Sequence, residues 1–163
     1  MLNEIDKAVL RKLQSNGRIA RSILAKDLGL PRATLQRRIA KLEMERVIEG
    51  YTALLNPYKL GYKFLSFVLI RARRTRPSGG KSTQLQLAKE LLKRGREGKD
   101  FPCIEEAHIV TGPYDILLKV WVRRWDDLTK FLTSQLPAYE AVEHTETILV
   151  LNRVGEHTEL KIE

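Results

Sequence analysis

The sequence has 163 residues, of which 43% are hydrophobic and 30% charged, and its formal net charge is +9. This length can bury one moderate core or two small ones, and the single cysteine excludes an internal disulfide framework and a multi-cysteine zinc site. Because the chain has neither a signal peptide's apolar core nor a run of about 18 apolar residues, we expect a cytoplasmic protein with no membrane partner.

The first 30 residues predict two helices. The first begins after Asn3, which can cap it, has Asp6 at its third position, and ends at Asn16-Gly17. Its apolar residues recur at helical spacing, and they are Ile5, Val9, Leu10 and Leu13. A short second helix ends at Gly29 and carries Ile23, Leu24 and Leu28.

A third helix is predicted from Pro31 to about Glu45, because the missing N–H of proline is not needed at a first helical position. Its core-facing residues are Leu35, Ile39 and Leu42. Two helices joined by a short turn containing Gly29 predict a helix-turn-helix, which places its second helix in the major groove of DNA.

The outer face of this third helix carries a stripe of positive charge. At about 100° per residue from Leu35, the stripe lies at about 200–300° and consists of Thr34, Arg37, Arg38 and Lys41. Arginine suits bidentate contact with guanine, whereas lysine and threonine suit phosphate oxygens or a base edge. Arg32 and Gln36 lie on the other flank and could read bases, and Arg18 and Arg21 could contact the DNA backbone. An ordinary solvated helix face is the alternative, but the absence of acids from the stripe favours DNA.

The rest of the chain predicts mostly strands. Residues 47–55 alternate as a strand does, with Gly50 permitting a turn or bulge, so we expect a winged helix-turn-helix over residues 1–50 and a strand or linker over 51–62. Strand patterns then follow at 64–72, 103–110, 114–122 and 142–151, with helical patterns around 82–95 and 125–136. This order predicts an α+β fold in which a β-α-β-β-α-β (ferredoxin-like) sandwich occupies residues 63–163.

Charge is unevenly distributed between these parts. Residues 71–99 contain 10 basic and 2 acidic side chains, whereas residues 100–163 contain 6 basic and 12 acidic ones. A basic front and an acidic back indicate two domains with different partners. The basic 71–99 segment could neutralise DNA phosphates, or it could be a solvated helix and loop.

Nothing in the sequence indicates an enzyme or a cofactor. The three histidines, His108, His144 and His157, lack metal-ligand spacing. No set of nucleophile, base and orienting residue is evident either. We therefore expect neither catalytic activity nor a metal.

Two long segments together resemble the leucine-responsive (Lrp/AsnC, feast/famine) regulators. The DNA-binding half of that family is similar to IDKAVLRKLQSNGRIARSILAKDLGL, TLQRRIAKLE and VIEGYTALLNPYKLG, and its amino-acid-binding half is similar to IEEAHIVTGPYDILLKVWV and FLTSQLPAYEAVEHTETILVL. The resemblance implies a transcription regulator that forms homodimers through the sandwich domain and assembles further into tetramers or octamers. With a composition rich in Lys, Arg and Glu, it points to a thermophilic archaeon.

The resemblance also implies an amino-acid effector bound between sandwich domains of neighbouring dimers. The matching positions are Gly112, Tyr114, Asp115, Thr133, Thr145 and Thr147. Without the resemblance, Gly112 to Asp115 is simply a turn between two strands. Asp115 suits the ligand's ammonium, and the threonines leave no second acid for a basic side chain, so we expect a neutral amino acid.

Three positions depart from the family pattern. Pro31 replaces a residue such as serine, Arg46 replaces a glycine, and Pro113 stands inside the effector loop. These observations predict a DNA-binding transcription regulator modulated by an amino acid. Two alternatives are an architectural DNA-binding protein that needs no ligand, and an enzyme-associated subunit that senses an amino acid.

Overall fold

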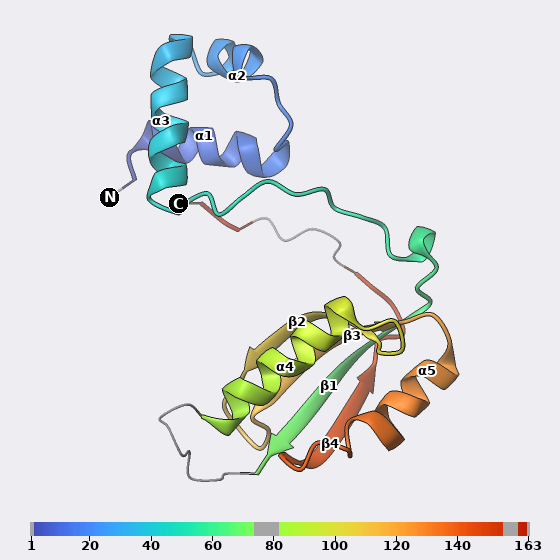
Figure 1. Ribbon diagram of the computed structural model, residues 1–163. Coiled ribbons are helices and arrows are strands. Elements are labelled where there is room, and N and C mark those ends of the chain that lie inside the picture. The colour runs from blue at the N-terminus through green and yellow to red at the C-terminus, as the bar shows by residue number, and fades with distance from the viewer. Residues whose placement is uncertain (1, 74–81, 155–159, 163) are drawn as a thin grey trace. The chain divides into compact units, whose positions relative to one another are not determined.

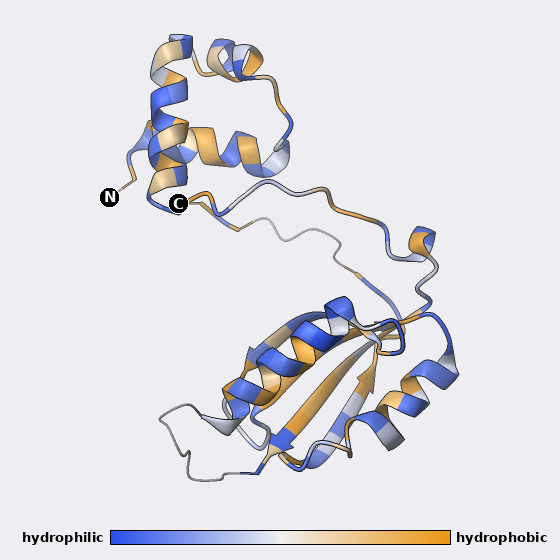
Figure 2. Ribbon diagram, in the orientation of Figure 1, coloured by the Kyte–Doolittle hydropathy of each residue, from blue (hydrophilic) through white to orange (hydrophobic). Residues whose placement is uncertain are grey.

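The computed structural model describes residues 2–73, 82–154 and 160–162. They belong to two compact units, which Figure 1 draws and Figure 2 colours by hydropathy. The first unit comprises Met1–Leu55 with Val154–Glu163, and the second comprises Asn56–Arg153. Among the described residues, no helix is long and apolar enough to cross a membrane.

The first unit contains the three predicted helices, α1 (Glu4–Ser15), α2 (Arg21–Asp27) and α3 (Arg32–Met44). The predicted cap of α1 is confirmed, because Asn3 Oδ1 accepts a 2.8 Å hydrogen bond from the Asp6 backbone N–H. Gly29, in the turn between α2 and α3, has a φ of 63°, which glycine adopts without a steric penalty. Pro31 precedes α3 instead of being its first residue. The three helices bury one core, formed by Val9, Leu13, Leu24, Ala25, Leu35, Ile39 and Leu42.

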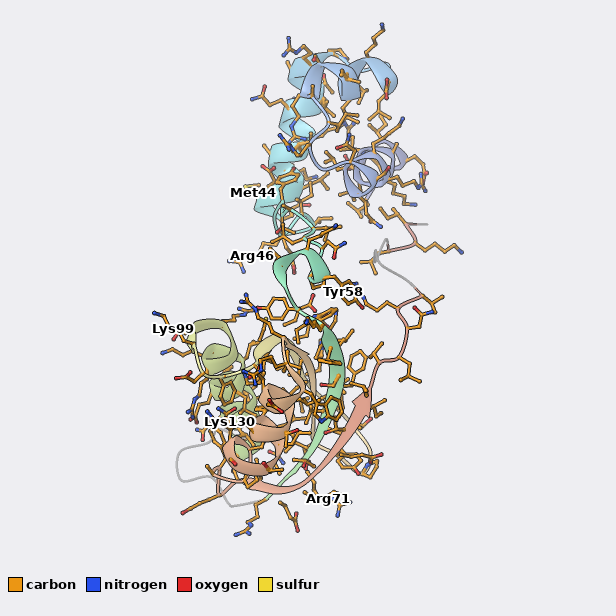
Figure 3. The ribbon with its side chains drawn as sticks, turned by 90° about the vertical axis from the view of Figure 1, so that its right-hand side faces the viewer. Met44, Arg46, Tyr58, Arg71, Lys99 and Lys130 are labelled. Carbon is orange, nitrogen blue, oxygen red and sulfur yellow. The ribbon has the colours of Figure 1, made fainter. Side chains whose placement is uncertain are left out.

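The strand predicted over residues 47–55 is not formed, so the predicted wing is wrong for the first unit as described. At the end of α3 the chain turns back through Arg46, which is labelled in Figure 3 and has a left-handed φ of 54°. The N–H groups of Val47 and Ile48 then donate to the Leu42 carbonyl at 2.9 and 3.1 Å. A strand needs a neighbouring backbone for its hydrogen bonds, and the described part of this unit contains no second strand.

The second unit has the predicted β-α-β-β-α-β order. Its strands are β1 (Phe64–Ala72), β2 (Cys103–Ile109), β3 (Ile116–Val122) and β4 (Val142–Leu149), and its helices are α4 (Thr83–Glu97) and α5 (Trp125–Lys130). A short 3-10 helix, η1 (Tyr58–Leu60), precedes β1, and a π-helical segment, η2 (Phe131–Gln135), follows α5. The sheet order is β2-β3-β1-β4 and every neighbouring pair is antiparallel.

Both helices cover the same face of this sheet (Figure 1). Because side chains alternate along a strand, Val68 and Ile70 of β1 face the helices and pack with Leu91 of α4 and Phe131 of η2 in one core. Gly95 lets α4 approach β2 closely, since a Cβ there would lie 2.5 Å from the Ile104 Cβ.

The opposite face of the sheet carries the alternate residues, and no α-helix among the described residues covers it. Phe67 and Leu69 of β1 are half-buried there, and Ile148 of β4 is 51% exposed. At one end Trp121 is buried under the rings of Tyr58 and Tyr62, whose centroids lie 5.8 and 6.3 Å from its own. This open face therefore combines apolar side chains, chiefly of β1, with charged ones such as Lys119, Glu106 and Glu146.

Candidate functional site

The stripe predicted on α3 is partly available to a ligand. Arg37 and Lys41 are exposed, Thr34 is half-buried, and the flanking Arg32 and Gln36 are exposed. Lys41 Nζ lies 3.7 Å from a carboxylate oxygen of Glu45, one turn further along the helix, in an exposed pair worth little in water. Arg32 and Arg37 make no ion pair with any residue that the structure describes.

Arg38 has a different role from the one predicted. Its guanidinium forms a 2.8 Å ion pair with Asp6 of α1 and lies 3.4 Å from Asn3 Oδ1. The two side chains of the ion pair are only 26% and 12% exposed. The position lies about 60° from Leu35 around the helix, near enough to the core for the long side chain to reach α1. Arg38 therefore joins α3 to α1 through this ion pair.

Arg21, predicted as a possible backbone contact, is also held within the unit. Its Nη2 donates a 3.1 Å hydrogen bond to the hydroxyl of Tyr51, and its guanidinium lies 5.5 Å from the centroid of that ring. The Tyr51 hydroxyl in turn donates to Glu43 at 2.9 Å. This network fixes the segment after α3 against α2 and α3, whereas Arg18 remains exposed.

In the second unit, the predicted effector loop joins β2 to β3. Gly112 has a φ of 119°, which only glycine readily adopts. Asp115 closes the loop onto β1, since its Oδ2 accepts a 2.9 Å hydrogen bond from the Ala72 N–H and its own N–H donates to the Ile70 carbonyl at 2.9 Å. The loop borders a pocket of about 400 Å³, lined by Arg71, Ala72, Arg73, Gly112, Pro113, Asp115 and Glu143.

Tyr114 lies beside residues of the open face. Its hydroxyl donates a short hydrogen bond to Glu146, and its ring stacks on His144 at 6.2 Å. The hydrogen bond to Glu146 and a smaller effect of burial raise the Tyr114 pKa, so the phenol stays protonated near neutral pH. The Arg71 guanidinium lies 6.0 Å from the ring centroid.

The predicted threonines lie elsewhere. Thr145 and Thr147 pair with Ile70 and Val68, so they share the helix-covered face, whereas Glu146 between them shares the open face. Thr133 lies in η2, where its hydroxyl donates a 2.8 Å hydrogen bond to the Thr129 carbonyl. Of the six predicted effector residues, only Gly112 and Asp115 therefore line the pocket at the loop. The single chain does not bring the six together.

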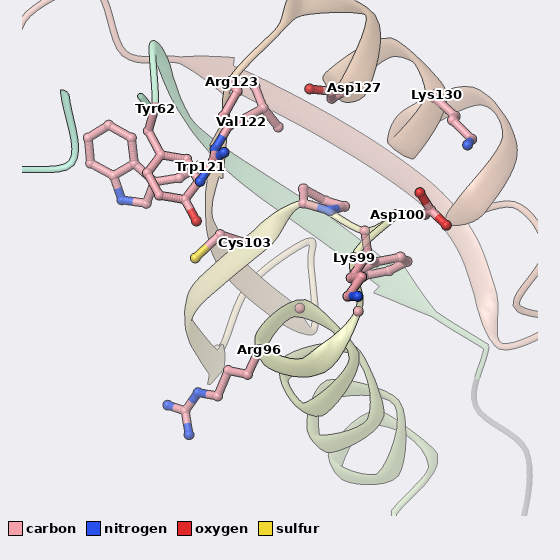
Figure 4. Close-up of a pocket in the computed structure, with 14 residues that line it drawn as sticks. Tyr62, Arg96, Lys99, Asp100, Cys103, Trp121, Val122, Arg123, Asp127 and Lys130 are labelled. Carbon is pink, nitrogen blue, oxygen red and sulfur yellow. The ribbon is translucent and has the colours of Figure 1, made fainter. Parts of the chain in front are cut away.

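The sequence analysis missed a second pocket in this unit, of about 570 Å³ (Figure 4). Its cations come from the end of α4, the end of β3 and α5, and they are Arg96, Lys99, Arg123 and Lys130. None of the four is ion-paired with a described residue. Burial, followed by the hydrogen bond with Cys103, raises the pKa of Tyr62 in its wall. The basic charge of residues 71–99 is the sequence signal that indicates a cationic site here. It does not indicate that Arg123 and Lys130 also line the pocket.

No group of three or more His, Cys, Asp or Glu side chains among the described residues could hold a metal ion.

Two family matches divide the chain in the same order as its two units. Residues 2–43 match the AsnC-type helix-turn-helix domain, and residues 82–160 match the Lrp/AsnC ligand binding domain. The HTH-type transcriptional regulator FL11 of Pyrococcus furiosus is 33% identical over 162 residues, which cover 99% of this chain and 97% of that protein. The leucine-responsive regulatory protein of Escherichia coli is 34% identical over 161 residues, covering 99% and 92%.

Solved structures show the same fold. Escherichia coli AsnC matches with a TM-score of 0.78 at 25% identity over 98% of both chains. A transcriptional regulator of Neisseria meningitidis, solved as a complex with L-methionine, matches with a TM-score of 0.81 at 22% identity, covering 99% of this chain and 97% of that one.

Proposed function

Because this chain belongs to the Lrp/AsnC family of transcription regulators, we propose that α3 reads a specific DNA sequence and that a neutral amino acid modulates this binding. In this proposal residues 1–50 bind DNA and residues 63–163 sense the ligand and hold the oligomer together. Residues 51–62 connect the two.

The observation that carries the DNA proposal is the exposed part of the basic stripe on the second helix of a helix-turn-helix. Arg37 has no acid partner among the described residues, so its guanidinium is available for bidentate contact with a guanine. Lys41 and Thr34 supply phosphate contacts, and Arg32 and Gln36 reach bases or phosphates nearer the start of α3. Arg38 contributes indirectly, because its ion pair with Asp6 holds α3 in position.

Selection of duplexes from a random pool by the purified full chain tests this proposal. We expect a shared motif to be enriched and the affinity to fall steeply as salt rises. Equal retention of all duplexes would favour the architectural alternative. Absence of binding even at low salt would contradict DNA binding and revive the enzyme-associated sensor.

The ligand proposal rests on the loop from Gly112 to Asp115 and on the hydroxyls of Thr145 and Thr147. Those two hydroxyls are half-buried and have no hydrogen-bond partner among the described residues, so they can accept and donate to a zwitterion. Asp115 keeps one carboxylate oxygen for the ligand's ammonium. Since the predicted residues do not converge within one chain, we propose that Thr133, Thr145 and Thr147 act where a neighbouring chain completes the site.

The preference for a neutral ligand rests on the charges around the loop pocket. Two arginines, Arg71 and Arg73, and two acids, Asp115 and Glu143, line this pocket. The sequence analysis did not predict Glu143 there. The two cations would repel a basic side chain. A neutral amino acid leaves no charge unpaired on binding.

The oligomer proposal rests on the open face of the sheet. Phe67, Leu69 and Ile148 leave an apolar surface that a second copy of the chain would bury. We propose a homodimer through this face, with tetramers or octamers forming where dimers complete ligand sites.

Calorimetric titration with each common amino acid, with oligomer size followed by light scattering, tests both proposals. We expect a neutral amino acid to bind and to change the oligomer size. Tight binding of lysine or arginine would contradict the pocket chemistry, and a monomer at every concentration would contradict the shared site.

A further inference from the structure

The last described residues of the chain, Leu160–Ile162, lie against α1 in the first unit. The Arg11 guanidinium donates two hydrogen bonds, of 3.2 and 2.9 Å, to the Ile162 carbonyl. The Gln14 amide donates one of 3.0 Å to the Leu160 carbonyl. Arg11 and Gln14 are three residues apart on α1 and so share one face of that helix, while the two carbonyls are two residues apart, as on one side of an extended segment.

A groove of about 730 Å³ accompanies these hydrogen bonds. It is lined by the segment Leu160–Ile162 itself and by Leu2, Leu10, Leu13, Gln14 and residues 46–51. Leu13 is buried in the helical core, and Leu2, Leu10 and Ile48 pack against that core. The side chain of Ile162 is partly buried, whereas Leu160 is 77% exposed. The groove therefore offers an apolar wall for one side chain and donors for two carbonyls.

We propose that the face of α1 that carries Arg11 and Gln14 is a docking site for an extended segment, and that its occupant is the chain's own residues 160–162, which thereby form one wall of the groove. Val154–Glu163 group with Met1–Leu55 of the same chain in one compact unit, and we take the docking to occur in cis. The first unit contains both the start of the chain, Met1–Leu55, and its last residues, Val154–Glu163. It therefore has two covalent connections to the sheet domain, one at Asn56 and one at Arg153. The carbonyls of Leu160 and Ile162 accept hydrogen bonds from α1, so the docked segment stabilises that helix.

Deletion of residues 160–163 from the full chain tests the docking, together with Ile162→Asp and Arg11→Ala as point variants. Thermal unfolding and hydrogen exchange of α1 are the readouts, and neither depends on DNA or ligand binding. We expect the unfolding of the first unit to shift down by about 4 °C or more in each case, with faster exchange along α1 and residues 46–51. Lys26→Ala, which removes an exposed cation of α2, is the matched control and should change neither readout.

Mixing the deleted chain with the Arg11→Ala chain identifies the occupant. Docking in cis predicts no restoration, because neither chain then has both segment and groove. Restored stability in the mixture would show that the segment comes from a second copy, and would overturn the cis assignment. Unchanged unfolding and exchange in all three variants would overturn the docking itself.

Discussion

Arg37 and Arg38 are adjacent in the sequence and have the same chemistry, yet they have different surroundings. Arg37 is exposed, whereas Arg38 is mostly buried and ion-paired with Asp6 at 2.8 Å. An arginine on the core-facing margin of a helix acts on stability, because removing it leaves a buried carboxylate without its partner. An exposed arginine contributes little to stability, and its main effect is on the affinity for a ligand that contacts it.

Arg37→Ala and Arg38→Ala should therefore affect different properties, namely operator affinity and stability respectively. We expect Arg37→Ala to weaken operator binding by roughly 1–3 kcal/mol, as for the loss of one good base contact, with no change in thermal unfolding. Arg38→Ala should lower stability by about 1–3 kcal/mol, because a charged hydrogen bond is lost. Fluorescence anisotropy with labelled operator and calorimetry of each variant measure the two effects. Equal loss of operator affinity in two equally stable variants would restore Arg38 to the DNA-reading stripe.

Arg46 is strained in a way that suggests a stabilising substitution. Its φ of 54° is costly for a residue with a Cβ. We expect Arg46→Gly to raise the stability of the first unit by about 0.5–1 kcal/mol, after the larger unfolded-state entropy of glycine is subtracted. Chemical denaturation measures this change, and Glu49→Gly, at an exposed position without positive φ, should instead destabilise. Destabilisation by Arg46→Gly would mean that the guanidinium makes a contribution larger than the backbone strain.

At the scale of elements, the close contact between α4 and β2 depends on one missing side chain. A Cβ on Gly95 would lie 2.5 Å from the Ile104 Cβ and 2.8 Å from its backbone nitrogen. The flexible end of a side chain could move away, but a strand backbone cannot move without disturbing the β2–β3 pairing.

We expect Gly95→Ala to destabilise the second unit by about 1–3 kcal/mol through overpacking, although alanine is the better helix former by about 1 kcal/mol. Gly50→Ala is the control, because nothing lies within 4 Å of a Cβ there and its φ is not positive. Both effects are measured by thermal unfolding. A stabilised Gly95→Ala variant would show that α4 can move away from β2 at little cost.

The effector loop is also organised at this scale, because Asp115 both anchors the loop and supplies its charge. Asp115→Asn retains an acceptor for the Ala72 N–H, whereas Asp115→Ala does not. We expect both variants to lose amino-acid binding, measured by calorimetry, and only Asp115→Ala to lose stability as well, by about 1 kcal/mol. Undiminished ligand binding by Asp115→Asn would remove Asp115 from the proposed site.

At the scale of the whole molecule, positive charge is concentrated in residues 71–99 and negative charge in the rest of the ligand-binding half. Residues 74–81 of this basic segment lie outside the described residues, but seven of its other cations are exposed and lack ion pairs with described residues. Four of these seven lie in α4 or directly after it and make no side-chain hydrogen bond with a described residue, and they are Lys89, Lys93, Arg96 and Lys99. Such a distribution raises the affinity for any polyanion and makes it dependent on salt.

Replacing these four cations with glutamine should therefore flatten the plot of log affinity for DNA against log salt by up to about four units. Preference for the operator over other duplexes should stay the same, since phosphate contacts carry no base information. Binding measured from low to moderate salt provides the slope. An unchanged slope would assign the segment to a solvated surface that DNA does not reach.

The sequence by itself determined the elements and the family. Helical spacing predicted α1, α2 and α3, strand-like runs predicted the four strands, and the glycines at 29 and 112 have the positive φ that their turns require. These features depend on residues close together in the chain, whose preferences are local. The basic stripe was also visible, because its members lie within two turns of one helix.

Only the tertiary structure decided which of these residues form contacts with one another and which remain available to a ligand. Arg38 pairs with Asp6 from 32 residues away, and Asp115 bonds to Ala72 from 43 residues away. Tyr114 and Thr145 lie on different faces of the sheet, and the described part of the first unit contains no strand with which residues 47–55 could pair. Arg11 likewise meets Ile162 across 151 residues. Spacing along the chain carries no information about such meetings, because they depend on how separate elements pack together and on which backbone groups remain available for hydrogen bonds.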